Sequence, residues 1–189
     1  MRNVVLIGFM GTGKSAVGRR LARILHRPFL DTDAEIERLI GKPVRRIFIE
    51  DGETRFRSEE ALLCRKLAVP RGLVVATGGG IVLNPENVAD LRKGGVLIGL
   101  SADPEVIYQR VRRKQSRPLL RGDVQARVRE LLEARAHAYG AAEFTVDTGK
   151  HSLPKTVGLI MGFLKERGYL EAGSDGQSGG VPELPDIPR

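Results

Sequence analysis

The sequence is poor in cysteine and in aromatic residues. Cys64 is the one cysteine among 189 residues, so no disulfide can form within the chain, and a reducing compartment such as the cytoplasm is expected. Tryptophan is absent, and aromatic residues make up 5% of the chain. A nucleic-acid-binding protein that stacks bases on aromatic side chains is therefore disfavoured, although the formal charge is +8.

Long apolar runs are also missing, and no membrane-spanning helix is expected. A cleavable signal peptide is not expected either, because its removal would destroy the glycine-rich motif described below. With 41% hydrophobic residues, a chain of this length can form one domain with a substantial core. The positive charge then fits a small phosphorylated or carboxylated ligand as well as it fits nucleic acid.

The most informative stretch lies near the N-terminus. Apolar residues 4–6 predict a short strand, the motif G-x-x-x-x-G-K-S follows at residues 8–15, and a helical apolar spacing comes next. The glycines let successive backbone N–H groups face a phosphate, and the helix N-terminus adds partial positive charge. Lys14 would reach the β- and γ-phosphates of a nucleotide, and the Ser15 hydroxyl would bind Mg²⁺. A glycine-rich turn without a ligand is the alternative interpretation.

Short apolar strands and helices alternate along the rest of the chain. Further strands are expected at 29–30, 73–76, 96–100 and 144–146, and helices at 35–40, 44–49, 53–67, 85–92, 104–113, 124–139 and 153–167. This alternation predicts an α/β fold of three layers, with a central five-stranded parallel sheet covered on both faces. Asn84 and Asp103 are expected to cap the helices that they precede.

Residues 1–170 are expected to form a single domain, and residues 171–189 a disordered acidic tail. The tail contains four glycines and three prolines, with four acidic residues against one arginine. A docking peptide is the alternative interpretation of this segment.

The motif Asp31-Thr32-Asp33 stands at the end of the second predicted strand. In an extended chain the two carboxylates would point the same way, while Thr32 points elsewhere. One carboxylate could then bind Mg²⁺ through water while the other faces the hydroxyl of an acceptor. Because a helix is expected just after it, the motif could equally serve only as a helix cap.

Three further clusters carry candidate binding residues. Arg57 and Glu60 are three residues apart on a predicted helix, so they either orient one another in a site or form a solvated surface pair. The triple glycine at residues 78–80 follows a strand and either offers bare N–H donors to a ligand or forms a flexible loop. Arg117 lies in the basic stretch 112–123, which is either a lid over a transferring phosphoryl group or a plain surface loop.

Taken in order, these pieces resemble the shikimate kinase family over about residues 3–165. The sequence reads G-F-M-G-T-G-K-S, D-T-D, I-F-x-x-x-G-E-x-x-F-R-x-x-E, G-G-G after a strand, R-P-L-L and R-x-x-x-Y. The resemblance implies a P-loop kinase fold like that of nucleoside-monophosphate kinases. It also implies transfer of the γ-phosphoryl group of ATP to the 3-hydroxyl of shikimate, in aromatic amino-acid biosynthesis. The expected enzyme is monomeric and cytoplasmic, uses Mg²⁺, and has no nucleic-acid or membrane partner.

The resemblance further implies a role for each matching residue, with the acceptor bound by segment 31–62. The residues expected to bind ATP are Gly11, Thr12, Gly13, Lys14, Ser15, Ala16, Arg110, Arg117 and Pro154, of which Arg110 and Pro154 would flank the adenine. The residues expected to bind shikimate are Asp33, Phe48, Phe56, Arg57, Glu60, Gly78, Gly79, Gly80 and Arg135. Asp33 would act as the base, and Lys14 and Arg117 would complete the catalytic set. Ser15 would bind the metal directly and Asp31 through water, because Thr77 stands where many P-loop enzymes carry an Asp.

Three other functions remain compatible with parts of the sequence. Another small-molecule kinase of the same fold, such as a gluconate or nucleoside-monophosphate kinase, would share the phosphate-binding motif. The positive charge suggests an NTPase module that binds nucleic acid. A catalytically inactive relative could retain the fold as an interaction module.

Overall fold

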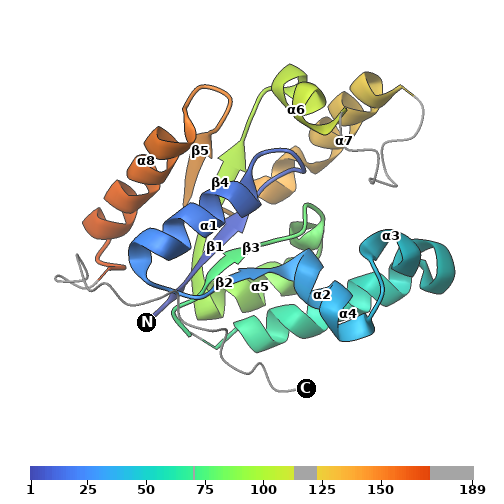
Figure 1. Ribbon diagram of the computed structural model, residues 1–189, viewed down its shortest axis with the longest axis horizontal. Coiled ribbons are helices and arrows are strands. Elements are labelled where there is room, and N and C mark those ends of the chain that lie inside the picture. Colours follow the sequence, from blue (N-terminus) through green and yellow to red (C-terminus); the bar gives the residue numbers. More distant parts are fainter. Residues whose placement is uncertain (70, 113–122, 171–189) are drawn as a thin grey trace.

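A computed structural model describes residues 1–69, 71–112 and 123–170, and every structural statement below concerns this part of the chain. The elements, shown in Figure 1, are β1 (Asn3–Ile7), α1 (Lys14–Leu25), β2 (Phe29–Asp31), α2 (Thr32–Ile40), α3 (Val44–Arg46), η1 (Ile47–Asp51), α4 (Gly52–Leu67), β3 (Val74–Ala76), η2 (Ile81–Leu83), α5 (Pro85–Gly94), β4 (Gly95–Ser101), α6 (Pro104–Val111), α7 (Val124–Tyr139), β5 (Phe144–Asp147) and α8 (Leu153–Glu166). Arg117, most of the expected lid and the expected tail lie outside the described residues.

The five strands form one parallel sheet, as the sequence predicts, and their order in it is β2-β3-β1-β4-β5. Strand β1 lies at its centre, where Val4 pairs with Val74 of β3 and with Val96 of β4. All five residues of β1 are buried, because helices cover both faces of the sheet, and this explains the continuous apolar run. The loop after β1 therefore emerges at the middle of the carboxyl edge, where ligands bind in folds of this kind.

Two helical layers enclose the sheet (Figure 1). On one face, α1 and α8 pack on Val4, Leu6 and their neighbours, and on the other face α4 and α5 pack on Val5 and Ile7. A third apolar cluster joins the loop after β1 to α6 and α7, with Phe9 and Met10 among its buried members. The phosphate-loop motif is thus supported by its own apolar cluster, separate from the two clusters on the faces of the sheet.

Most predicted elements are confirmed, and Val124–Tyr139 has the predicted bounds. Asn84 caps α5 as expected, since its side chain accepts a hydrogen bond from the Glu86 N–H at 2.9 Å. The capping role expected for Asp103 is wrong. Asp103 occupies the N-cap position of α6, but its side chain makes no capping hydrogen bond. The following Pro104 has its φ fixed near the helical value, which lets the helix start without that bond.

The short helix expected at residues 44–49 is only partly right. Its first three residues form α3, and the chain then widens into the π-helix η1, which ends at Gly52 with φ of 84°. Single π-turns of this kind often mark functional segments. No helix in the described ranges combines the length and apolar character needed to cross a membrane.

Candidate active site

The loop after β1 has the geometry of a phosphate-binding loop. Gly13, with φ of 93°, turns the chain into α1 in a conformation that favours glycine. The next residue, Lys14, is buried, and its ammonium group donates hydrogen bonds to the carbonyls of Gly8 at 2.7 Å and Phe9 at 2.9 Å. The ammonium group therefore lies inside the curve of the loop, beside the N-terminus of α1, where the motif predicts bound phosphates.

Ser15 and Asp31 meet beside this loop. The Ser15 hydroxyl donates to Asp31 Oδ2 at 2.7 Å, although the two residues come from α1 and from the end of β2. The other oxygen of Asp31 accepts a hydrogen bond from the backbone N–H of Asp33 at 3.2 Å and so caps α2. A hydroxyl and a carboxylate are oxygen ligands of the type that Mg²⁺ prefers.

The extended geometry predicted for residues 31–33 is wrong. Helix α2 already begins at Thr32, so Asp33 lies in its first turn and not on the same side of a strand as Asp31. Thr32 does point elsewhere, since its buried hydroxyl accepts a hydrogen bond from the Gly78 N–H at 2.8 Å. Asp31 does cap α2, and this local geometry places Asp31 at the phosphate loop and Asp33 at the glycine loop (residues 78–80).

A cleft of about 590 Å³ connects these features. Its lining consists of Met10, Gly11, Gly13, Lys14, Ser15, Ala16, Arg19, Asp31, Asp33, Thr77, Gly79, Gln109, Arg110 and Val111. Its volume lies in the range of sites for small molecules and nucleotides. Arg19 was not among the expected site residues, although its place one helical turn after Ser15 was readable in the sequence.

The glycine loop approaches three polar side chains closely. A side-chain carbon on Gly78 would lie 2.5 Å from Asp33 Oδ1 and 3.0 Å from Glu60 Oε1. One on Gly80 would lie 2.7 Å from Arg57 Nη1. All three distances are shorter than ordinary contacts, so the glycines let the backbone and these side chains meet. This close approach favours a role for residues 78–80 in a site over the flexible-loop interpretation.

Arg57 and Glu60 form a partly buried ion pair beside this loop. Arg57 Nη1 donates to Glu60 Oε2 at 2.5 Å, and the guanidinium also donates to Glu53 Oε1. The Glu60 side chain is 1% exposed, whereas that of Arg57 is 30% exposed. Burial raises the pKa of Glu60 to about 7, and the Arg57 charge only partly opposes this rise. The pair is not a solvated surface pair. Glu53, which the G-E-x-x-F-R motif includes but to which no role was assigned, is its third member.

Two phenylalanines that were expected to pack against the substrate ring lie next to this ion pair. The rings of Phe48 in η1 and Phe56 in α4 are 5.0 Å apart between centroids. Phe56 is buried, and the Arg57 guanidinium lies 5.5 Å from its ring centroid. The π-helical turn thus brings an apolar surface to the side of the acceptor region that carries Arg57.

Helix α7 also contacts the glycine loop. Arg135 is half-buried there, and Tyr139, one turn later, donates a hydrogen bond from its hydroxyl to the Gly79 carbonyl at 2.7 Å. Burial raises the pKa of Tyr139 to about 12, an effect that the neighbouring Arg135 charge reduces. The sequence predicted a role for Arg135 but none for Tyr139, whose spacing from Arg135 is the signal that could have found it.

Of the two residues expected to flank the adenine, one lines the cleft and the other does not. Arg110 lines the cleft, but its guanidinium donates to the Gly11 carbonyl at 3.2 Å and to the hydroxyl and carbonyl of Thr148 at 2.9 and 2.7 Å. It therefore braces the phosphate loop against the turn after β5. Pro154 is exposed in the first turn of α8 and is not among the residues that line the cleft. Contacts of these two residues with adenine stay a prediction.

Together the parallel sheet, the phosphate loop and the acidic and basic groups beyond it define a class. The chain is a P-loop kinase of the kind that phosphorylates a small molecule. The acceptor region offers a guanidinium, a carboxylate of α2 and backbone N–H groups, which suit an anion that carries hydroxyls.

Comparison with known proteins identifies the family within this class. The family model described as shikimate kinase matches residues 10–164. A shikimate kinase of Desulforudis audaxviator is 88% identical over 189 residues, which is all of both chains, and one of Pelotomaculum thermopropionicum is 60% identical over 90% of this chain and all of its own. The structure of a shikimate kinase from Acinetobacter baumannii in complex with shikimate matches with a TM-score of 0.83 at 35% identity, covering 88% of this chain and 94% of the other.

The chain belongs to the shikimate kinase family. It is an ATP-dependent phosphotransferase that phosphorylates the 3-hydroxyl of shikimate. This assignment removes the gluconate kinase and nucleoside-monophosphate kinase alternatives that the phosphate loop left open.

Proposed function

We propose that Asp33 is the general base of this transfer and that the acceptor lies between Asp33, the glycine loop and Arg57. The observation that carries the proposal is the convergence of Asp33, Glu60 and Arg57 on one short loop, residues 78–80, at the end of the cleft that contains Lys14. The loop connects the acceptor groups directly to the phosphate loop, since a side-chain carbon on Gly79 would lie 3.2 Å from the Met10 backbone nitrogen. Acceptor and donor sites therefore adjoin, as direct phosphoryl transfer requires.

The shikimate carboxylate is assigned to Arg57 and Arg135. The first lies on α4 and the second on α7, so they can hold one anion from two sides of the glycine loop. Glu60 and Glu53 fix the Arg57 guanidinium through hydrogen bonds, and Phe48 and Phe56 offer the ring of the substrate an apolar surface. A carboxylate held in this way leaves the hydroxyls on the other side of the ring to face Asp33.

On the nucleotide side, Lys14 and the backbone N–H groups of residues 11–16 are assigned to the phosphates. Ser15 and Asp31 fit a Mg²⁺ site, because two oxygen ligands lie 2.7 Å apart beside the phosphate loop. The described residues contain no cluster of three or more His, Cys, Asp or Glu suited to a metal, so phosphate oxygens and water would complete the coordination. Bound there, Mg²⁺ would neutralise charge on the β- and γ-phosphates.

The transfer itself then needs little covalent chemistry from the protein. Asp33 accepts the proton of the 3-hydroxyl as that oxygen attacks the γ-phosphorus, and the bond from the γ-phosphorus to the β,γ-bridging oxygen breaks. Lys14 stabilises the charge that develops on the phosphoryl oxygens. Arg117 is proposed to assist from the segment that follows α6, as the family resemblance implies.

A coupled assay of ADP release tests the acceptor assignment. Shikimate should support turnover, whereas quinate and gluconate at equal concentration should support little, because the proposed site holds both a carboxylate and a 3-hydroxyl at fixed positions. Equal rates with gluconate would contradict the assignment. We also propose a monomer in the cytoplasm, since one chain supplies all assigned residues, and light scattering at working concentration tests the monomer.

A further inference from the structure

We propose that Tyr139 is a positioning residue for the acceptor site, which holds the glycine loop in place and keeps Arg135 opposite Arg57. This inference rests on the proposed function, because it assigns the glycine loop and both arginines to shikimate. Tyr139 has no role in that proposal, and it is the one described residue of the R-x-x-x-Y motif left unused.

The first observation is the hydrogen bond from the Tyr139 hydroxyl to the Gly79 carbonyl, 2.7 Å long. The two residues are 60 positions apart, so the bond ties α7 to the loop after β3. The loop itself has no side chains with which to anchor its own position. Its neighbours on both sides face the acceptor, since Gly78 lies against Asp33 and Glu60, and Gly80 lies against Arg57.

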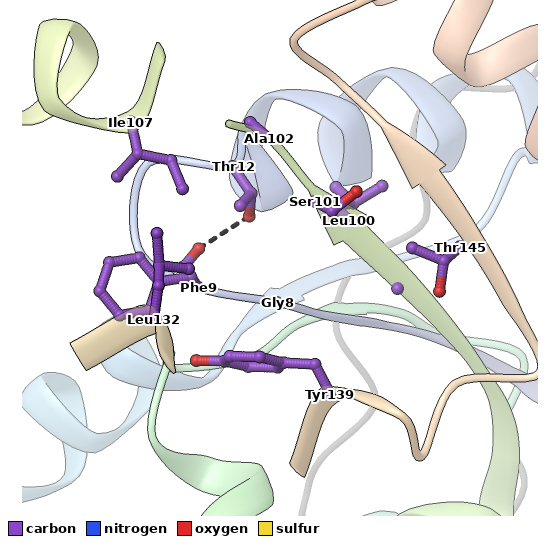
Figure 2. A pocket seen from close by; sticks show the side chains of 11 residues that line it. Gly8, Phe9, Thr12, Leu100, Ser101, Ala102, Ile107, Leu132, Tyr139 and Thr145 are labelled. Carbon is purple, nitrogen blue, oxygen red and sulfur yellow. Dashed lines mark hydrogen bonds between the residues drawn. The ribbon is translucent and has the colours of Figure 1, made fainter. Parts of the chain in front are cut away.

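The second observation is that the Tyr139 ring is itself held firmly. It packs both on the core beneath β1 and β3 and on the separate cluster that contains Phe9 and α6. Tyr139 lines a cavity of about 70 Å³, and Figure 2 shows its ring at the lower side, below Phe9 and next to Leu132, with Gly8, just after the end of β1, above it. A ring fixed between two cores presents its hydroxyl at a defined point, which a side chain on the surface could not do.

The third observation concerns Arg135. Its guanidinium lies close enough to the Tyr139 hydroxyl for its charge to reduce the rise in the pKa of that phenol. Arg135, the Tyr139 hydroxyl and the Gly79 carbonyl therefore follow one another from α7 to the loop. Removing the hydroxyl leaves the half-buried carbonyl without this donor and Arg135 without this neighbour, and both changes fall on the acceptor side of the cleft.

The phosphate loop has supports that do not involve Tyr139. Thr12 donates to the Phe9 carbonyl from its side chain at 2.7 Å, and Lys14 donates to the carbonyls of Gly8 and Phe9. The loss of the tyrosine hydroxyl should therefore weaken shikimate binding and leave ATP binding nearly unchanged. A residue that only stabilised the fold would affect both ligands alike.

The test is Tyr139→Phe in the full-length enzyme, with Tyr169→Phe as the matched control. The control also removes one phenol hydroxyl and one hydrogen bond, in this case to the exposed Glu143 at 2.8 Å. We expect the KM and the calorimetric Kd for shikimate to rise about three- to tenfold in Tyr139→Phe, which is the usual effect of losing one hydrogen bond. In Tyr139→Phe, the ATP Kd measured without shikimate and the melting temperature should stay close to those of the wild type. Tyr169→Phe should resemble the wild type in all of these measurements.

Two outcomes overturn the inference. An unchanged shikimate Kd in Tyr139→Phe shows that the hydroxyl does not position the site, and a parallel rise of both Kd values with a lower melting temperature shows a general structural role. Arg57→Lys, measured in the same series, separates this failure from a failure of the proposed function. If Arg57→Lys weakens shikimate binding and Tyr139→Phe does not, only the positioning role of Tyr139 is wrong. If Arg57→Lys leaves shikimate binding unchanged, the proposed acceptor site itself is wrong.

Discussion

The guanidinium of Arg57 donates a hydrogen bond of 2.5 Å to the carboxylate of Glu60, which is almost wholly buried. A buried carboxylate is costly unless it is paired, and the Arg57 charge meets only part of that cost, because the pKa of Glu60 is still raised to about 7. Glu60 therefore orients Arg57 at the expense of stability. This relationship makes the acceptor site sensitive to pH and to changes on either partner.

The first prediction concerns stability against pH. The pKa of Glu60 rises from 4.5 to about 7 on folding, so between these values the folded chain binds more protons than the unfolded chain. The contribution of Glu60 to stability is therefore fully present below about pH 4.5 and is lost as the pH rises through 7. Glu60→Gln removes this titration, and its melting temperature should fall less than that of the wild type between pH 5 and 7.5, on the order of a few degrees. Scanning calorimetry without ligands measures the difference, and parallel curves for the two proteins would contradict it.

The second prediction concerns the close approach at the glycine loop. Gly80→Ala places a carbon where Arg57 Nη1 would be 2.7 Å away, so the guanidinium must shift from its position beside Glu60. We expect the kcat/KM for shikimate to fall by about tenfold or more, since bidentate recognition depends on that position, while ATP binding is retained. Gly158→Ala is the matched control, because a side-chain carbon there meets no atom within 4 Å, and it should be neutral or slightly stabilising. Equal effects of the two substitutions would argue against a steric origin.

The third prediction concerns Lys14. Lys14→Ala removes the cation inside the phosphate loop, and kcat should fall by about 10²–10³ or more, as for other preorganised groups that stabilise transition-state charge. Lys93→Ala removes an exposed lysine paired with Asp90 and should leave turnover unchanged. The coupled ADP assay with saturating shikimate measures both variants. Near-normal turnover of Lys14→Ala would show that the phosphate loop takes no part in the mechanism.

Much of the fold was predictable because its signals are local. Short continuous apolar runs such as residues 4–6 are typical of strands buried on both faces, and the phosphate-loop motif carries its own strand and helix. Strand order depends on which distant surfaces fit together, and the insertion of β3 between β2 and β1 had no local signal. The π-turn at Ile47–Asp51 was missed for a similar reason, since it depends on packing around Phe56 and not on helical spacing.

Within the site, residue types were easier to predict than their geometry. Asp31 and Asp33 were identified, but the sequence left open whether they stand in extended chain or, as the structure has it, at the cap and in the first turn of a helix that begins at Thr32. The partners of Gly79 and Thr32 come from residues 46 to 60 positions away, which no spacing rule can reveal. The spacing of Tyr139 from Arg135 could have marked it as a site residue, but its contact with Gly79 was visible only once α7 and the glycine loop were seen together.

The fourth prediction concerns the base. Asp33→Asn keeps the size of the side chain but cannot accept a proton, so kcat should fall by about 10²–10⁴ while ATP affinity stays nearly intact. Single-turnover rates and calorimetric ATP binding with Mg²⁺ measure the two effects. Asp31→Asn serves as the comparison, since Asp31 contacts Ser15 beside the phosphate loop and should weaken binding of the Mg²⁺–ATP complex. If Asp33→Asn lost ATP binding and Asp31→Asn did not, the two roles would have to be exchanged.

The last prediction concerns the proposed carboxylate clamp. Arg57→Lys keeps the charge but loses the planar fork that donates to both Glu53 and Glu60, so kcat/KM for shikimate should fall by at least about tenfold. Arg57→Ala should cost more, because it also leaves Glu60 buried without its partner. The methyl ester of shikimate should be a poor substrate of the wild type, and Arg57→Ala should discriminate against it much less, because the ester carries no charge for Arg57 to bind. Equal phosphorylation of ester and acid by the wild type would refute the clamp and, with it, the placement of the acceptor between Arg57 and Arg135.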